Sequence, residues 1–446
     1  MASNQLHVDH GMLGKKGRYR YAGRDGRCAQ CDGKTERDGQ HRGAAVEKDD
    51  LAAMSLDTAL SEPALETRPA LPRAARRAVS LIFAANGTLA GTWAARIPAI
   101  QQHLGLQSGA LGLALLGAAV GCLVATNAAG YLAARFGSSL VTTVSGLLFC
   151  CTVPLLALAP SLPWLALGLA LYGATGGSMG VALNTQGVAV ERRYHQPILT
   201  SFHAFFSFGG LIGAFLAGIA GGRGIVPLTH FVAISAIAAV CLVVAARYLL
   251  PARADAGGGS SSFVFPSGTL LMLGVIAFCT VLSEGAVADW SAIYLQHTVA
   301  TGAALAAGGY AAFSLLMAAG RLVGDSLAER IGPTAVVRAG TLMAATGISL
   351  ALLVPWAPVA ITGFALVGAG LSAVFPIVIS AAGRSRGISS GNAIATVATC
   401  GYFGFLVGPP SIGFLAQVVS LRLALLLIVA LSLLATALSP RVGDGR

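Results

Sequence analysis

The segment Leu132-Ala-Ala-Arg-Phe-Gly137 recurs as Leu327-Ala-Glu-Arg-Ile-Gly332, and the two copies are 327 − 132 = 195 residues apart. Two further pairs of segments share this offset. Gly168-Leu-Ala-Leu-Tyr-Gly-Ala174 recurs as Gly363-Phe-Ala-Leu-Val-Gly-Ala369, and Phe208-Gly209-x-Leu211-x-Gly213 recurs as Phe403-Gly404-x-Leu406-x-Gly408. Chance matches are easy in a chain with 57 glycines, but three matches in one register indicate an internal duplication.

The composition around these repeats is that of a membrane protein. Of the 446 residues, 55% are hydrophobic and 11% are charged, whereas about a quarter of the residues of a soluble domain are charged. So few polar groups cannot cover the surface of a soluble protein of this size. The apolar segments are long and continuous rather than alternating, which argues against a β-barrel.

Each apolar stretch is long enough for a transmembrane helix, which needs about 20 residues. The expected spans are 78–99, 108–133, 139–159, 163–189, 198–221, 228–250, 267–294, 303–326, 333–354, 358–382, 391–416 and 422–439. The repeated segments fall in equivalent spans of the two sets of six. The sequence therefore predicts an all-α, polytopic protein with about twelve transmembrane helices in two pseudo-symmetric six-helix halves.

Composition also divides the chain into segments. Residues 1–75 are polar and are expected to form a disordered cytoplasmic segment. The six-helix halves are expected at 76–250 and 267–440, joined by a Gly- and Ser-rich cytoplasmic linker at 251–266 and followed by a short tail at 441–446. Met54 is a second candidate for the native start.

Arginine placement predicts the orientation in the membrane. One side receives Arg73, Arg76, Arg77, Arg135, Arg192, Arg193, Arg253, Arg330, Arg384, Arg386 and Arg441, and the other receives Arg96, Arg223 and Arg422. By the positive-inside rule the first side is cytoplasmic, so both termini are expected inside a bacterial-type inner membrane. Because the positive charge is spread over loops rather than gathered in one patch, we expect membrane lipid and not nucleic acid as a partner.

Motifs for enzymatic chemistry carry little weight in this chain. The sequence has no Gly-x4-Gly-Lys-Ser/Thr loop for ATP, and Gly176-Gly-Ser178-Met-Gly180 lies inside an apolar helix rather than at a hydrolase turn. Cys28-Ala-Gln-Cys31 could bind zinc with His7 and His10, but no second ligand pair has standard spacing. We therefore expect no enzyme activity, no cofactor and no metal.

The duplicated halves and the loop after the second span of each half resemble the major facilitator superfamily. Finer features are Trp93-x-x-Arg96-Ile-Pro98, Asn184-x-x-Gly187-x-x-x-Glu191-Arg192, His203-x-Phe-x-Ser207-x-Gly209, Glu284-Gly-x-x-x-Asp289-Trp290 and Gly404-Phe-x-x-Gly408-Pro409-Pro410. Together they are similar to the YbjJ-type inner-membrane permeases, a branch near the fucose permeases. The resemblance implies alternating access, with a substrate site between the halves. The chain departs from the pattern at Ala134, where the superfamily loop has Asp, and at Gly180, where fucose permeases have Glu.

Acidic residues inside the spans are rare, and each is costly to insert in a bilayer. Glu284, in span 7, is the main candidate for substrate binding or coupling. A carboxyl group in a low-dielectric cavity keeps its proton more readily than in water, so this residue could carry a proton; it could also bind a sugar hydroxyl or a cation. The alternative is a structural hydrogen bond to a neighbouring helix.

Several charged residues are candidates for gating. Arg96 and Asp289 are both expected near the periplasmic mouth, where an ion pair between them could close an outer gate; the alternative is a static pair at the rim. Arg321 and Asp325 have the i, i+4 spacing of a pair on one helix face. In the repeated loop the gating candidates are Arg135, Glu329 and Arg330, and Glu329 could favour the N-terminus of span 5 through the helix dipole.

Uncharged residues complete the candidate substrate site. The polar candidates are Asn86, Asn184, His203 and Asn392, and the aromatic candidates for stacking on a sugar ring or drug are Trp93, Trp290, Tyr310 and Tyr402. The alternative for His203 is a hydrogen-bonded packing role, and the alternative for the tryptophans is the interfacial position that is common for Trp in membranes. We expect a secondary transporter of a small polar or amphipathic solute, with sugars among the candidates, and a coupling proton or cation. A multidrug efflux permease and a non-transporting membrane receptor or scaffold remain as alternatives.

Overall fold

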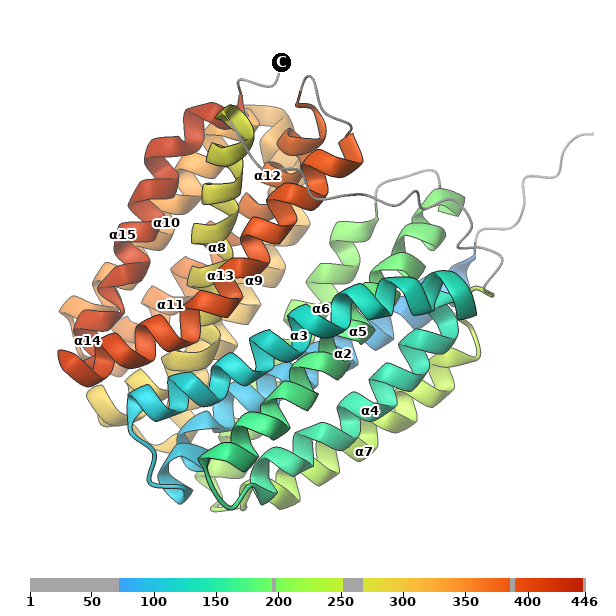
Figure 1. The fold of residues 1–446 in the computed structure, drawn as a ribbon. Helices are drawn as coiled ribbons and strands as arrows, with labels where there is room; N and C mark the ends of the chain where they lie inside the picture. The colour runs from blue at the N-terminus through green and yellow to red at the C-terminus, as the bar shows by residue number, and fades with distance from the viewer. Residues whose placement is uncertain (1–71, 195–197, 252–267, 386–389, 444–446) are drawn as a thin grey trace, which may run out of the picture. The chain divides into compact units, whose positions relative to one another are not determined.

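The computed structural model contains twelve helices, or pairs of consecutive helices, that are long and apolar enough to cross a membrane within its described residues. The first six are α2 (Arg73–His103), α3 (Ser108–Phe136), α4 (Ser138–Leu158), α5 (Leu162–Tyr194), α6 (Leu199–Gly222) and α7 (Pro227–Ala246). They form the N-terminal half (Figure 1). This number and these positions confirm the predicted all-α membrane fold.

The C-terminal half repeats this order, but two of its spans are broken. Its helices are α8 (Gly268–Ile293), α9 (Ala303–Ile331), α10 (Pro333–Leu353), α11 (Ala357–Leu371), α12 (Val374–Gly383), α13 (Ser390–Val418), α14 (Leu421–Ala424) and α15 (Leu426–Leu438). A π-helical turn (Tyr294–Thr298) extends α8, and a 3₁₀ turn (Ser439–Val442) follows α15. The tenth span is thus broken between α11 and α12, and the twelfth between α14 and α15.

The structure describes residues 72–194, 198–251, 268–385 and 390–443. Helix α2 begins at Arg73, so the expected N-terminal segment 1–75 is helical in its last three residues. The rest of that segment, with Cys28 and Cys31, lies outside the described residues. The expected linker also lies outside them except for Pro251.

The helix boundaries themselves repeat at the offset of 195 residues. Adding 195 to the bounds of α3 (108 and 136) gives those of α9 (303 and 331). Adding 195 to the bounds of α4 (138 and 158) gives those of α10 (333 and 353). The duplication that three short segments indicate therefore extends to where the helices start and stop.

Backbone conformation follows the same repeat at two turns. Gly137 and Gly332, which end the repeated loop segment, have φ of 90° and 88°. Gly105 has φ of 60°, and its equivalent, 105 + 195 = 300, is Ala300 with φ of 58°. Ala300 is the one non-glycine residue with positive φ in the described part of the chain. The turn before α9 thus keeps the left-handed shape of the first copy without its glycine.

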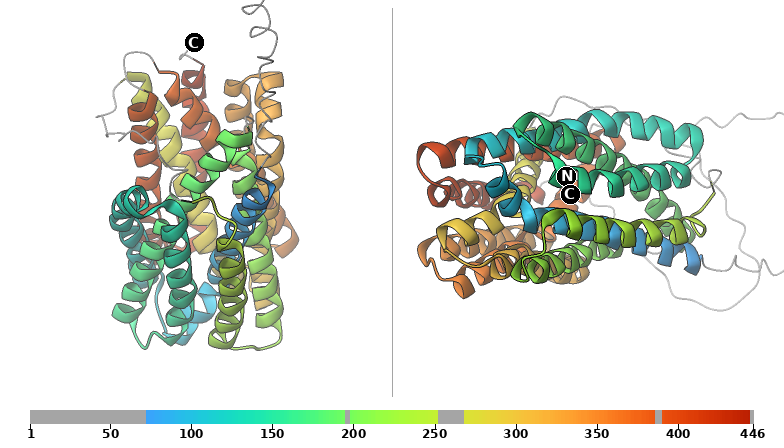
Figure 2. Two further views of the ribbon diagram at one scale, coloured as in Figure 1. Left: turned by 90° about the vertical axis from the view of Figure 1, so that its right-hand side faces the viewer. Right: turned by 90° about the horizontal axis from the view of Figure 1, so that it is seen from below.

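Equivalent helices pack on each other in the two halves. Helix α3 packs on α5 as α9 packs on α11, and α2 packs on α6 as α8 packs on α13. Two other contacts, α6 with α9 and α3 with α13, join the halves and exchange under the repeat. We call these two contacts, with the smaller one between α2 and α8, the seam. Figure 2 shows the halves from two further directions.

Glycines let α2 and α6 approach closely. A Cβ atom added at Gly209 or Gly213 would collide with the carbonyl oxygens of Ala84 and Thr88. Both glycines lie on α6, and both carbonyls lie on α2. This G-x-x-x-G pair therefore has the close-packing role that such pairs have in membrane helices.

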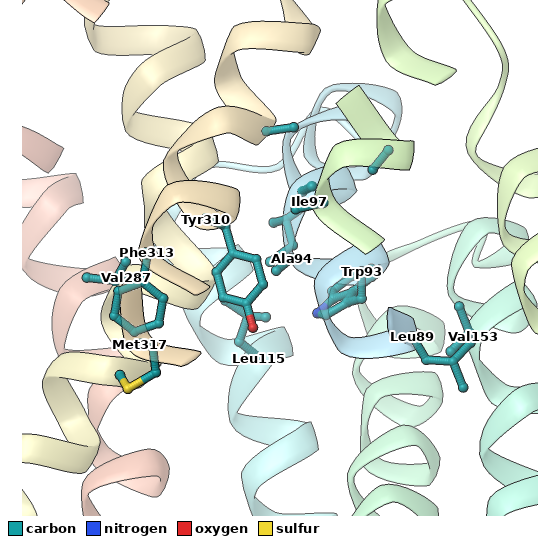
Figure 3. Packing of buried hydrophobic residues seen from close by; sticks show 14 of the residues in the cluster. Leu89, Trp93, Ala94, Ile97, Leu115, Val153, Val287, Tyr310, Phe313 and Met317 are labelled. Atoms are coloured by element: carbon teal, nitrogen blue, oxygen red, sulfur yellow. The ribbon is translucent and has the colours of Figure 1, made fainter. Parts of the chain in front are cut away.

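The buried core and the exposed apolar surface fit a bilayer environment. One cluster of buried hydrophobic residues includes side chains of both halves, among them Leu89, Trp93, Val287 and Phe313 (Figure 3). Large apolar side chains also remain exposed, such as Val418 at 82%. In a soluble protein such exposure would be costly, whereas lipid is as apolar as these side chains.

Arginines gather at one end of the helices, which we call the arginine-rich end. It contains the start of α2 with Arg73 and the ends of α3, α5 and α9 with Arg135, Arg192 and Arg330. We call the other end, with Arg96 and the turn from α6 to α7, the opposite end. This distribution is the one expected from the sequence.

The left-handed alanine gives a test of the repeat. Replacing Ala300 by Gly should stabilise the protein by about 1 kcal/mol, because an L-residue with a Cβ pays roughly that amount for positive φ. Replacing Gly105 by Ala should destabilise it by a similar amount. Thermal unfolding of the purified full-length protein in detergent measures both. A loss of stability in the Ala300→Gly variant would contradict the left-handed assignment.

Candidate functional site

An ion pair inside the helical bundle forms the centre of the candidate site. The Arg321 Nη2 atom on α9 lies 3.7 Å from Glu284 Oε2 on α8, and the two side chains are 15% and 18% exposed. The predicted pairing of Arg321 with Asp325 is therefore wrong, because the guanidinium extends to the neighbouring helix rather than along its own.

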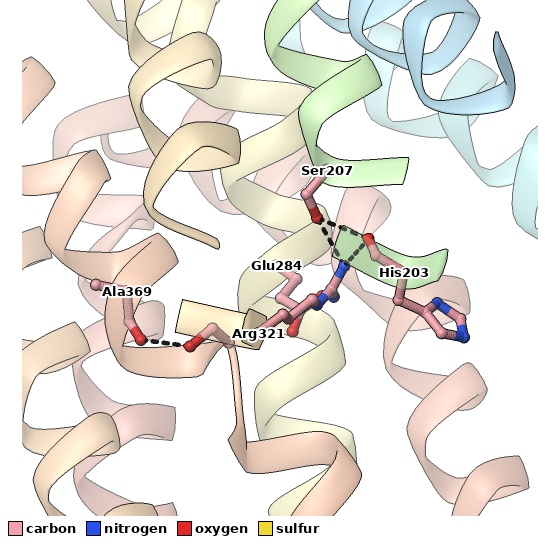
Figure 4. Close-up of polar contacts among 6 residues, drawn as sticks. His203, Ser207, Glu284, Arg321 and Ala369 are labelled. Atoms are coloured by element: carbon pink, nitrogen blue, oxygen red, sulfur yellow. Dashed lines mark hydrogen bonds and ion pairs between the residues drawn. The ribbon is translucent and has the colours of Figure 1, made fainter. Parts of the chain in front are cut away.

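The same guanidinium crosses the seam to the N-terminal half. Arg321 Nη1 donates to Ser207 Oγ at 2.7 Å and to the His203 carbonyl oxygen at 3.3 Å, both on α6. Ser207 Oγ also donates to that carbonyl, at 3.3 Å. Figure 4 shows the Arg321 side chain between Glu284 and these α6 groups. One cation thus links α8, α9 and α6.

The His203 side chain extends the contacts to a fourth helix. Its Nε2 atom lies 3.1 Å from Asn184 Oδ1, and Asn184 Nδ2 donates to the Gly180 carbonyl at 2.8 Å on α5. The imidazole ring also packs against Phe83, with ring centroids 5.2 Å apart. We call Glu284, Arg321, Ser207, His203 and Asn184 the Arg321 cluster. It contains three of the residues predicted to bind substrate.

Asp325 makes a second contact across the seam. Thr200 Oγ1 on α6 donates to Asp325 Oδ2 at 3.2 Å. Asp325 is exposed and lies one helical turn beyond Arg321, toward the arginine-rich end. Both members of the predicted pair therefore contact α6 instead of each other.

The start of α6 is capped by Glu191 and not by Glu329. Glu191 Oε2 accepts hydrogen bonds from the backbone N–H groups of Ile198 and Leu199, both at 2.7 Å. A carboxylate at this position satisfies free N–H groups and favours the positive end of the helix dipole. Glu329 is exposed, as are Arg135 and Arg330. The expected capping of span 5 by Glu329 is thus absent in this conformation.

The predicted Arg96–Asp289 pair is also not formed. Arg96 is buried, and its Nη2 atom donates to the Ile225 carbonyl in the turn between α6 and α7. Asp289, on α8, is partly exposed. The sequence places both residues at a similar depth in the membrane, but it does not determine the direction in which each side chain leaves its helix. Here the Arg96 side chain extends to the turn before α7 and not to Asp289.

The aromatic candidates divide into packed and exposed residues. Trp93 packs within the N-terminal half against Tyr172 and Phe231, at centroid distances of 6.3 and 6.5 Å, and Trp290 is 0% exposed. Both tryptophans are therefore buried among other side chains in this conformation and are not free to stack on a solute. Tyr310 is 7% exposed and stacks on Phe313 at 5.9 Å, whereas Tyr402 is 55% exposed.

Two asparagines complete the predicted set. Asn86 is buried on α2 at 9% exposure. Asn392 lies in the first turn of α13 and is partly exposed. The hydrogen bonds of the Arg321 cluster run to α5, α6 and α8, so the geometry gives Asn86 on α2 no role in them.

A model of the Major Facilitator Superfamily matches residues 79–387 of the chain. The chain belongs to the major facilitator superfamily. An uncharacterised MFS-type transporter of Yersinia pestis is 35% identical over 361 residues, which cover 81% of this chain and 94% of the relative. The membrane protein MosC of Rhizobium meliloti is 34% identical over 366 residues, covering 81% of this chain and 88% of the relative.

Solved structures of other transporters share the superfamily fold. A bacterial homologue of the human lysosomal transporter Spinster, in an inward-facing and occupied conformation, matches with a TM-score of 0.64 and 15% identity over 83% of this chain and 96% of its own. The nucleoside transporter NupG matches with a TM-score of 0.62 and 11% identity, over 83% of this chain and 98% of its own. Its membership of this superfamily, together with the transporter relative of 35% identity, makes the protein a non-enzymatic membrane transporter.

Two contact residues of this superfamily member were not among the predicted site residues. Ser207 follows His203 by four residues, so both lie on one face of α6, which is the face that Arg321 contacts. Glu191 precedes α6 by eight residues, and only the shape of the intervening turn identifies it as the cap. The spacing of Ser207 from His203 predicts that they share a helix face. The capping of α6 by Glu191 could not be predicted in this way, because it depends on tertiary structure.

The ion pair predicts a non-additive pair of substitutions. Arg321→Gln should leave the Glu284 carboxylate without a counter-charge, and Glu284→Gln should leave Arg321 with its α6 contacts alone. The double variant Glu284→Gln/Arg321→Gln should be more stable than the sum of the single losses predicts, by about 1–3 kcal/mol. Thermal or denaturant unfolding of all four proteins measures this coupling. Strict additivity would show that the pair contributes nothing.

Proposed function

We propose that this superfamily member is a secondary transporter that moves a small polar, sugar-like solute by alternating access. The observation that carries the proposal is the Arg321 cluster, in which a partly exposed cation joins Glu284 of one half to Ser207 and His203 of the other. Charged groups inside a membrane bundle commonly mark a substrate or ion pathway. Hydroxyl groups of a sugar-like solute are suitable partners for a guanidinium, a carboxylate and an imidazole.

Helices α3 and α13 are in contact near the opposite end and separate toward the arginine-rich end, which supports a conformation that is open toward the arginine-rich end. Near the opposite end, Gln417 Nε2 on α13 donates to Gln107 Oε1 beside α3 at 3.0 Å. At the arginine-rich end of α3, Tyr131 is 62% exposed and Arg135 is exposed too. Figure 1 shows α3 and α13 diverging in this direction. If the positive-inside rule holds, this opening faces the cytoplasm and both termini lie inside.

Arg321 gives the proposed cycle a physical switch. In this conformation the guanidinium is shared between Glu284 and α6. Protonation of Glu284 removes its charge and so weakens the attraction to Arg321, while a bound solute offers new acceptors to the cation. A proton or a cation at Glu284 can therefore shift the balance between conformations, provided that it binds one of them more tightly.

The polarity of the cluster favours a polar solute over an apolar drug. The groups that meet here are a guanidinium, a carboxylate, a hydroxyl, an imidazole and an amide, all of which can exchange hydrogen bonds with a polar solute. The two tryptophans that would suit a drug are buried in packing.

The role of Glu284 can be tested by transport. Once a thermal-shift screen of sugars and polyols on the purified protein has found a ligand, Glu284→Gln should abolish solute-driven proton movement in proteoliposomes. Exchange of solute across the membrane without net proton movement should persist. The Glu329→Gln variant is the matched control, because it removes an exposed carboxylate of α9 and should retain proton movement.

Two outcomes of this assay contradict the proposal at different levels. A Glu284→Gln variant that transports with the wild-type dependence on pH removes Glu284 as the proton carrier. Binding without any flux in wild-type proteoliposomes removes transport of that ligand and favours a receptor.

A further inference from the structure

A cavity of about 250 Å³ lies at the opposite end of the bundle, away from the Arg321 cluster. Both halves line it. The N-terminal half contributes Arg96, Gln102 and Pro227, and the C-terminal half contributes Gln296 and Ala303. A molecule bound there would touch the two halves at once, on the side of the seam where α6 meets α9.

Arg96 is a buried cation with no counter-ion. Its side chain is 5% exposed, Nη2 donates to the Ile225 carbonyl, and Nε has no hydrogen-bond partner among the described residues. None of the acidic side chains in the described ranges forms an ion pair with it. An isolated charge out of water is costly, so a buried guanidinium is normally paired with an anionic group.

Two helices begin at residues that line the same cavity, which places the positive ends of their dipoles beside it. Helix α7 begins at Pro227 and α9 begins at Ala303, and both residues line the cavity. Neither helix has a side-chain cap, so Ala303 offers a free N–H group, whereas Pro227 has none and contributes only through the dipole of α7. Free N–H groups and the dipole together make a helix N-terminus attractive to anions. Arg96 and the two helix N-termini would therefore all attract an anion in this cavity.

The remaining lining adds hydrogen-bond donors but no negative charge. Gln102 and Gln296 carry amide groups that can donate to an anion, and the other lining residues are apolar or glycine. No aspartate or glutamate of the described ranges lines the cavity. The volume leaves room for a small ion and a few waters.

We propose that this cavity binds a small monovalent inorganic anion of the chloride type, held by Arg96 and the N-termini of α7 and α9. The site is separate from the Arg321 cluster and does not depend on the transported solute. The anion neutralises Arg96 of one half and contacts the start of α9 in the other, so its binding stabilises the conformation in which this end is closed.

The test is an anion titration of the purified full-length protein in detergent. Sodium chloride or sodium bromide replaces sodium gluconate at constant ionic strength, and the unfolding temperature is measured. Chloride and bromide should raise it along a saturating curve, by about 1–2 °C at tenfold the midpoint concentration, because a ligand that binds only the folded state stabilises it by mass action. Equal unfolding temperatures in chloride, bromide and gluconate would overturn the proposal.

Variants distinguish this site from a general salt effect. Arg96→Gln should abolish the saturating shift, whereas Arg223→Gln, which removes an exposed arginine at the same end, should keep the wild-type midpoint. Gln296→Leu removes one donor without touching the buried charge and should raise the midpoint concentration several-fold. It provides the test if the Arg96 variant does not fold. Wild-type midpoints in both the Arg96 and the Gln296 variants would overturn the assignment.

Discussion

A charged guanidinium inside an apolar bundle must be compensated on every side, and Arg321 on α9 meets this constraint with groups from two neighbouring helices. Glu284 supplies the counter-charge from α8, while Ser207 and the His203 carbonyl supply acceptors from α6. In the apolar interior of the bundle these partners have to come from the protein itself. The need to satisfy one cation therefore ties the two halves together at the level of the membrane interior.

The duplication explains why the seam has two similar sides, and the side chains explain why they differ. Contacts of α6 with α9 and of α3 with α13 exchange under the repeat. Polar residues on α6 and α9, including Thr200 and Asp325, extend the first contact to the arginine-rich end. The equivalent region of α3 leaves Tyr131 exposed. A symmetric backbone thus carries an asymmetric set of hydrogen bonds across the seam.

Hydropathy and the repeat were sufficient to predict the spans, because a bilayer demands a long apolar segment wherever a helix crosses it. The position of each charged residue along its helix could be predicted too. The neighbouring helix that its side chain faces could not. Arg321 and Asp325 have the spacing of a pair, yet both turn to α6. Arg96 has the depth of Asp289, yet it extends to the turn before α7. Such choices depend on which helices are neighbours, and one sequence does not determine that.

The glycine contact between α2 and α6 has a mechanical consequence. The backbones of these two helices approach so closely at Gly209 and Gly213 that no side chain fits between them, and we expect α2 and α6 to move together. Helix α6 carries the acceptors for Arg321 near one end of this pair, and α2 carries Arg96 near the other. A movement of α2 at Arg96 would therefore reach the α6 groups that accept from Arg321. The proposed solute and the proposed anion would then act on the same pair of helices.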